Sequence, residues 1–168
     1  MDNSSFITRF AQEFEAEIPA TRKCLERIPE SLYDWKPHET SATMGYLTQL
    51  VAEIPKWLAV MISDSVIDFK TFQHMTAKNT GEMLAQFDDH LQQVREALKD
   101  LTDDRLSKPF VLKDGDNIMI NSSLAENLAS TLNHWIHHRG QLTVYMRLRG
   151  IAVPSIYGPS GDENPFRK

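Results

Sequence analysis

The longest helical pattern in the chain runs from about Ser123 to Arg149 and most constrains the fold. Inward-facing residues recur along it at spacings of three and four, the period of a helix with one face in a core. Ser123 and Glu126 stand in capping-box register at its start, while Gly150 and Pro154 predict its end. A helix of this length needs partners of similar length to cover its apolar face.

Three further amphipathic patterns supply such partners. They run from about Ser5 to Ile28, from Thr43 to about Met61 and from Asn79 to about Leu101. Asn79 is a good N-cap residue, and Glu82 stands three positions later in capping-box register. Four amphipathic helices of three to six turns predict an all-α protein with the architecture of a four-helix bundle.

The segments between the helices break the helical period. Residues 63–78 form a linker to which the pattern assigns no structure, and the tail 153–168, rich in Pro, Gly and Ser, should be irregular. Within 103–121, two apolar triplets flank a segment with the turn pair Asp114-Gly115. This arrangement predicts a short hairpin or an ordered loop before the last helix. We expect residues 1–168 to form a single domain.

Composition excludes several classes of protein. The 168 residues carry a formal net charge of -5, so no basic surface for nucleic acid is expected. No apolar run is long enough to cross a bilayer, so we expect no membrane partner. Residues 1–5 carry neither the cationic flank nor the apolar run of a secretory signal, which points to a cytoplasmic protein. The single Cys24 cannot form an intrachain disulfide, and its place on an apolar stripe predicts burial.

Two histidines four residues apart form the most chemically informative motif. His134 and His138 project from nearly the same face of the last helix, a spacing that one transition-metal ion can bridge. The helical seam predicts that His138 points into the core with His134 on its shoulder. His137 lies about one hundred degrees away from His138 around the helix, so we expect it to face solvent.

Two imidazoles alone do not complete a metal centre. A catalytic zinc site normally takes three protein ligands, so a third would have to come from another helix. The alternative is that hydrogen bonds satisfy the two rings. Arg139 could pair with a buried carboxylate, bind an anionic ligand or extend to the surface. Gly140, in mid-helix, predicts the close approach of another group.

These motifs resemble those of the DinB family, also called the DinB/YfiT-like metalloenzymes. The resemblance rests first on His134-x-x-x-His138-Arg139-Gly140-Gln141 and the helix that follows it to Gly150. It extends to the tail 153–163, to Trp35-Lys36-Pro37-His38 with Met44-Gly45-Tyr46-Leu47, and to Lys108-Pro109-Phe110 with Asp114-Gly115.

The resemblance implies a four-helix bundle of up-down-down-up type, often paired as a homodimer, and a nickel or zinc ion held by three histidines. Two of these would be His134 and His138. The third belongs to the second helix, in a pattern like G-x-L-x-x-H-x-A-E, where this chain has Leu50. Leucine cannot bind a metal. Glu53 could replace the missing ligand, Gln49 is a poorer donor that points elsewhere, and water could complete a two-histidine site.

Two kinds of function therefore remain open. Members of the family with known activity use low-molecular-weight thiols, which implies a metal-dependent, thiol-dependent transferase. In that case Glu53 would be a substitute ligand or general base, and Arg139 or Gln141 would orient the substrate. The alternative is a non-catalytic homodimeric bundle or a small-molecule binding protein that has lost the metal. Trp57 and the other large apolar residues could line its pocket, although their spacing is typical of a core. His38, His74 and His90 belong to no comparable pattern.

Overall fold

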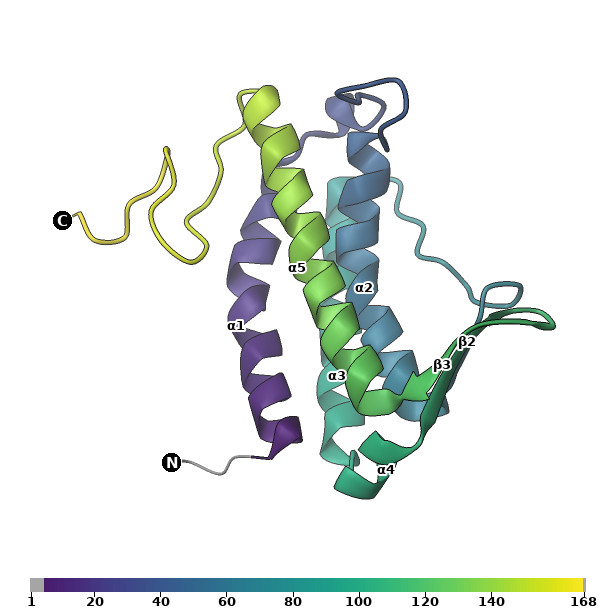
Figure 1. The fold of residues 1–168 in the computed structure, drawn as a ribbon. Coiled ribbons are helices and arrows are strands. Elements are labelled where there is room, and N and C mark those ends of the chain that lie inside the picture. The colour runs from purple at the N-terminus through teal and green to yellow at the C-terminus, as the bar shows by residue number, and fades with distance from the viewer. Residues whose placement is uncertain (1–4, 168) are drawn as a thin grey trace.

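Four long helices lie side by side in the computed structural model, which describes residues 5–167 (Figure 1). They are α1 (Phe6–Arg27), α2 (Met44–Asp64), α3 (Thr80–Lys99) and α5 (Leu124–Leu148). The shorter elements are η1 (Glu30–Leu32), α4 (Asp103–Ser107), β1 (Val66–Asp68), β2 (Pro109–Asp114) and β3 (Asn117–Ser123). Each long helix covers a segment in which the sequence predicts one, and residues 153–167 form no helix or strand, as expected.

Side-chain caps begin the long helices where the sequence predicts them. The Ser123 hydroxyl accepts a hydrogen bond from the Glu126 N–H, and the Glu126 carboxylate accepts one from the Ser123 N–H, which confirms this capping box. The Asn79 side chain likewise accepts from the Glu82 N–H. The reciprocal half of the second box was wrong, because the Glu82 carboxylate accepts from the Lys78 N–H instead.

The all-α prediction was incomplete, because a small three-stranded sheet lies beside the helices (Figure 1). The predicted hairpin is present as β2 and β3, which pair antiparallel. Gly115 adopts a φ of +61° in its turn, a conformation that favours glycine. The sequence did not predict β1, which lies in the 63–78 linker and pairs parallel with β2. A strand of three residues is too short to produce a periodic pattern.

Trp135 occupies the centre of the helical core. Its ring packs 5.5 Å from that of Phe14 on α1 and 6.2 Å from that of Phe87 on α3, between ring centroids. Its indole N–H donates to the Val51 carbonyl of α2 at 2.8 Å. Cys24 is fully buried as expected, and burial raises the pKa of its thiol to about 11. Trp135 therefore joins α5 to the other three long helices.

The inward face of α5 departs from the predicted seam at two positions, because Arg139 and Met146 are buried where the sequence predicted His138 and Tyr145. Arg139 is 2% exposed and lies between the core residues Trp135 and Leu142, whereas His138 is half-buried. The sequence predicted His138 rather than Arg139 on the inward face from the helical periodicity alone. The positions are reversed here because a buried carboxylate of α1 receives the Arg139 side chain.

That carboxylate belongs to Glu17, which forms an ion pair with Arg139. The Arg139 guanidinium also donates to the Glu17 carbonyl at 3.2 Å, to the Thr21 hydroxyl at 3.1 Å and to the Tyr157 hydroxyl at 3.0 Å. The Tyr157 hydroxyl in turn donates to the Glu17 carboxylate at 2.9 Å. Arg139 thus joins α1, α5 and the C-terminal tail. Of the three possibilities that the sequence left open for it, the structure shows the pairing with a buried carboxylate.

The prediction of a close neighbour at Gly140 was wrong, because nothing lies within 4 Å of the position that a Cβ would occupy. Gly140→Ala should therefore stabilise the protein by up to about 1 kcal/mol, the difference in helix propensity. Gly45 provides the matched contrast, since its added Cβ would lie 2.8 Å from the Tyr33 Cβ. Urea unfolding followed by circular dichroism should show opposite changes for Gly140→Ala and Gly45→Ala. Destabilisation by Gly140→Ala would contradict this.

Candidate functional site

The two histidines of α5 lie in direct contact. The Nε2 atoms of His134 and His138 are 2.6 Å apart, and both rings are half-buried. His137 is exposed, as the helical wheel predicts. The His134 ring also packs against Trp57 of α2, with 5.8 Å between the ring centroids. The pair therefore lies on the α2 side of α5, whereas Arg139 faces α1.

Gln141 indicates which nitrogen of the His138 ring is the donor. Its amide oxygen lies 2.7 Å from the Nδ1 of His138, so this nitrogen is the donor and the Nε2 of His138 keeps a lone pair. The Nε2–H of His134 then donates to that lone pair. The two rings can satisfy each other in this way without a metal.

His134 should titrate below the ordinary range of histidine. Burial lowers the pKa of His134, and the adjacent His138 and His137 lower it further. Because the folded pKa lies below the unfolded value of about 6.5, the unfolded chain binds the proton first as the pH falls. The stability due to neutral His134 is present above this value and is lost as the pH falls towards the folded pKa.

Two measurements check this prediction. Proton NMR should give a His134 pKa below about 6.5. Urea unfolding should show that His134→Gln reduces the loss of stability between about pH 7 and about pH 5, whereas His38→Gln in the exposed 36–41 loop serves as the control. A His134 pKa above the ordinary value would contradict the prediction.

Leu50 lies where the family resemblance places a third ligand. Helix α2 runs antiparallel to α5, because Tyr145 bonds to the Ala42 carbonyl while Trp57, further along α2, meets His134. Leu50 precedes Trp57 by two turns on the same face, which brings it level with His138 and the residues just after it. The side chain at this position is half-buried and apolar.

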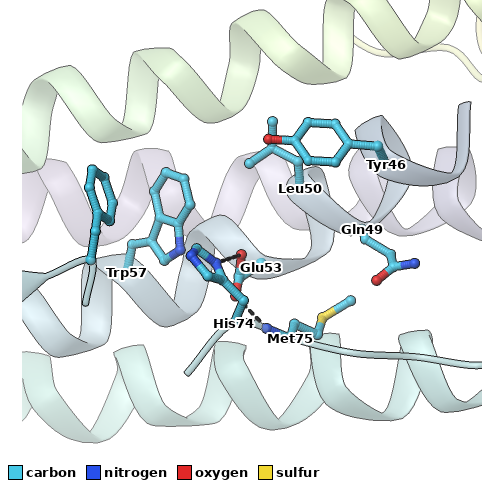
Figure 2. Close-up of a pocket in the computed structure, with 8 residues that line it drawn as sticks. Tyr46, Gln49, Leu50, Glu53, Trp57, His74 and Met75 are labelled. Atoms are coloured by element: carbon cyan, nitrogen blue, oxygen red, sulfur yellow. Dashed lines mark hydrogen bonds and ion pairs between the residues drawn. The ribbon is translucent and has the colours of Figure 1, made fainter. Parts of the chain in front are cut away.

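Both oxygens of Glu53, the expected substitute ligand, are already in use. One accepts a hydrogen bond from the Met75 N–H, and the other lies 3.0 Å from the Nδ1 of His74 (Figure 2). Among residues 5–167, no three His, Cys, Asp or Glu side chains are grouped so that they could hold a metal ion. The residues present therefore do not fit the three-ligand centre that the resemblance implies.

A cavity of about 640 Å³ lies over this face of α2 (Figure 2). We call it the α2 cavity. Its lining residues are Tyr46, Gln49, Leu50, Glu53 and Trp57 of α2, with Phe69, His74 and Met75 of the segment that follows β1. Such a volume is typical of a site for a small organic molecule, and apolar walls with a few polar groups are typical of its lining. Leu50, at the position where the family resemblance implies a third ligand, supplies part of an apolar wall.

A second cavity of about 310 Å³ lies between the sheet and the helices α2 and α5. Its walls are largely apolar, with contributions from Phe110 and Leu112 of β2 and from His134 of α5. Trp57 and Phe69 line both cavities. His134 therefore borders one cavity, while Glu53 and His74 border the other. Arg139, the other candidate catalytic residue from the sequence, lines neither.

The comparisons with known proteins agree with this architecture. The sequence model of the DinB family matches residues 1–164, and the chain belongs to this family. An uncharacterized protein of Bacillus subtilis (strain 168), YrdA, is 30% identical over 162 residues, which cover 94% of this chain and 91% of the relative.

Solved structures show the same fold. A DinB-like protein of Bacillus subtilis, YjoA, superposes with a TM-score of 0.70 at 22% identity, over 87% of this chain and 96% of that chain. A DinB-like protein from Bacillus cereus ATCC 10987 gives a TM-score of 0.67 at 23% identity, over 88% and 95% of the two chains. None of the helices formed by residues 5–167 has the length and apolar content that a membrane span requires.

Proposed function

We propose that this protein binds a small, largely apolar organic molecule in the α2 cavity and does so without a metal ion. The observation that carries the proposal is that Leu50 lines the cavity, at the position where the family resemblance implies the third metal ligand. The same substitution removes a donor and adds apolar surface. Of the functions that the sequence leaves open, this is the small-molecule binding protein.

The lining defines the class of ligand. Leu50, Trp57, Phe69 and Met75 offer aliphatic, aromatic and thioether surface for the body of a molecule. Polar groups at the wall come from Gln49, Glu53 and His74. A compact aromatic or branched molecule with a single polar substituent matches this combination.

A metal-dependent enzyme is the second candidate, and one observation favours it. The Nε2 atoms of His134 and His138 point at each other, and Gln141 holds the far side of the His138 ring, as supporting residues do around metal ligands. Nickel or zinc would then be held by two histidines and solvent. The thiol-dependent transfer implied by the family resemblance belongs to this candidate. A homodimer is compatible with both candidates. Sedimentation would test the dimer.

Binding of 4-ethylphenol, followed by two-dimensional NMR in the presence of EDTA, tests the first candidate. We expect saturable shifts of the Leu50 and Met75 methyl groups and a dissociation constant in roughly the millimolar range or below, given so few ligand atoms. Trp57→Ala should weaken binding about tenfold through lost contact area. Trp35→Ala, which removes an indole outside the cavity, is the matched control. An absence of saturable shifts at millimolar probe would contradict the proposal.

A further inference from the structure

A carboxylate and an imidazole form a hydrogen-bonded pair in the wall of the α2 cavity, away from the histidine pair of α5. The Glu53 side chain is 7% exposed, and its carboxylate lies 3.0 Å from the Nδ1 of His74. The His74 side chain is 53% exposed, so the ring is anchored on one edge and open on the other. Figure 2 shows Glu53 bonded both to His74 and to the backbone of Met75.

The segment that carries His74 is held at several points. Its backbone is bonded to α2 through Glu53 and through the Lys56 ammonium, which donates to the Gln73 carbonyl. It is bonded to α3 through the Gln86 amide, which donates to the Thr76 carbonyl at 2.8 Å. The ring of Phe72 packs edge-on against His74, 5.2 Å between centroids. The imidazole therefore has a defined position in an otherwise irregular segment.

The carboxylate determines which His74 nitrogen carries the proton. Carboxylate oxygens accept hydrogen bonds, so the Nδ1 of His74 is the donor and the Nε2 holds a lone pair. Within residues 5–167, this Nε2 has no hydrogen-bond partner. The arrangement resembles the support that carboxylates give to functional histidines, in which the second nitrogen faces the ligand.

We infer that His74 Nε2 is the hydrogen-bond acceptor of the α2 cavity, and that the cavity selects apolar molecules bearing a hydroxyl, thiol or N–H donor. Glu53 is the positioning residue, because it fixes the tautomer of His74 and both its oxygens are already bonded to His74 and the Met75 N–H. The inference rests on the proposed function, since it names the ligand class of the same cavity. Glu53 and His74 would then act together in recognising the ligand. The metal-dependent candidate gives these two residues no joint role.

The experiment compares two probes of nearly the same shape, 4-ethylphenol, which has an O–H donor, and 4-ethylanisole, which has none. The wild-type protein should bind the phenol about three- to tenfold more tightly, the ratio given by one neutral hydrogen bond. His74→Phe keeps an aromatic ring and should abolish this preference while the anisole still binds. Equal affinities of the wild type for both probes would overturn the inference and leave the proposed function intact. Failure of both probes to bind would overturn both.

A measurement on the free protein tests the pair independently of any probe. Nitrogen-15 NMR should show His74 in the Nδ1–H tautomer in the wild type. In Glu53→Gln the single amide oxygen cannot accept from both the Met75 N–H and the His74 Nδ1–H. If that oxygen keeps the Met75 N–H, the amide NH₂ faces His74, and the tautomer should change to Nε2–H with loss of the phenol preference. An Nε2–H tautomer in the wild type would overturn the inference.

Discussion

Leu50→His should convert this protein into a stoichiometric binder of nickel or zinc. The new imidazole would lie on α2 opposite His138, whose Nε2 already converges with that of His134. Three protein ligands are the normal complement of such a centre. After incubation with metal and gel filtration, untagged Leu50→His should hold about one equivalent, against less than about a tenth of an equivalent for the wild type.

Gln49→His is the matched control, because it places the same side chain on the adjacent position of α2, about one hundred degrees around the helix. It should not raise metal content above that of the wild type. Adding His138→Ala to Leu50→His should abolish the gain. If Leu50→His binds no more metal than the wild type, the correspondence between α2 and the histidine pattern of the family is wrong.

Arg139→Met should cause the largest loss of stability, about 3–5 kcal/mol, because it leaves the Glu17 carboxylate buried without a cation. The variant also removes the donors to the Thr21 hydroxyl and to the Glu17 carbonyl. Methionine preserves much of the volume, so the effect measures the charge and the hydrogen bonds rather than a cavity. Urea unfolding followed by circular dichroism gives the free energy of unfolding.

The Arg95–Glu15 pair provides the control, since it also joins α1 to another helix but has side chains 40% and 47% exposed. Arg95→Met should cost no more than about 1 kcal/mol. The double variant Glu17→Met, Arg139→Met should be less destabilised than the sum of the single variants, because no unpaired charge remains. Equal effects of Arg139→Met and Arg95→Met would contradict a structural role for the buried pair.

The sequence predicted the elements whose evidence is local. The four long helices follow from apolar periodicity, and the caps at Ser123 and Asn79 follow from residue types at fixed spacings. The hairpin follows from two apolar triplets around Asp114-Gly115. Strand β1 was missed because three residues give no period, and it pairs with β2 only in the folded molecule.

The candidate site was harder to predict than the helices, because it depends on contacts between residues that are distant in the sequence. His134 and His138 could be paired from their spacing alone, and their contact agrees with that prediction. The burial of Arg139 could not be predicted, because its partner Glu17 lies 122 positions away in sequence. His74 was missed for the same reason, since an irregular segment has no periodicity that would point its ring at Glu53. The only feature of the sequence that pointed to this part of the site was Glu53, which the family pattern includes.

We propose above that the α2 cavity binds small molecules without a metal at the histidine pair. The most direct test is the dissociation constant of 4-ethylphenol, measured by NMR with EDTA and again with one equivalent of zinc, for the wild type and for His138→Ala. We predict the same constant for both proteins under both conditions. Binding that requires zinc and is lost in His138→Ala would contradict metal-free binding in the α2 cavity.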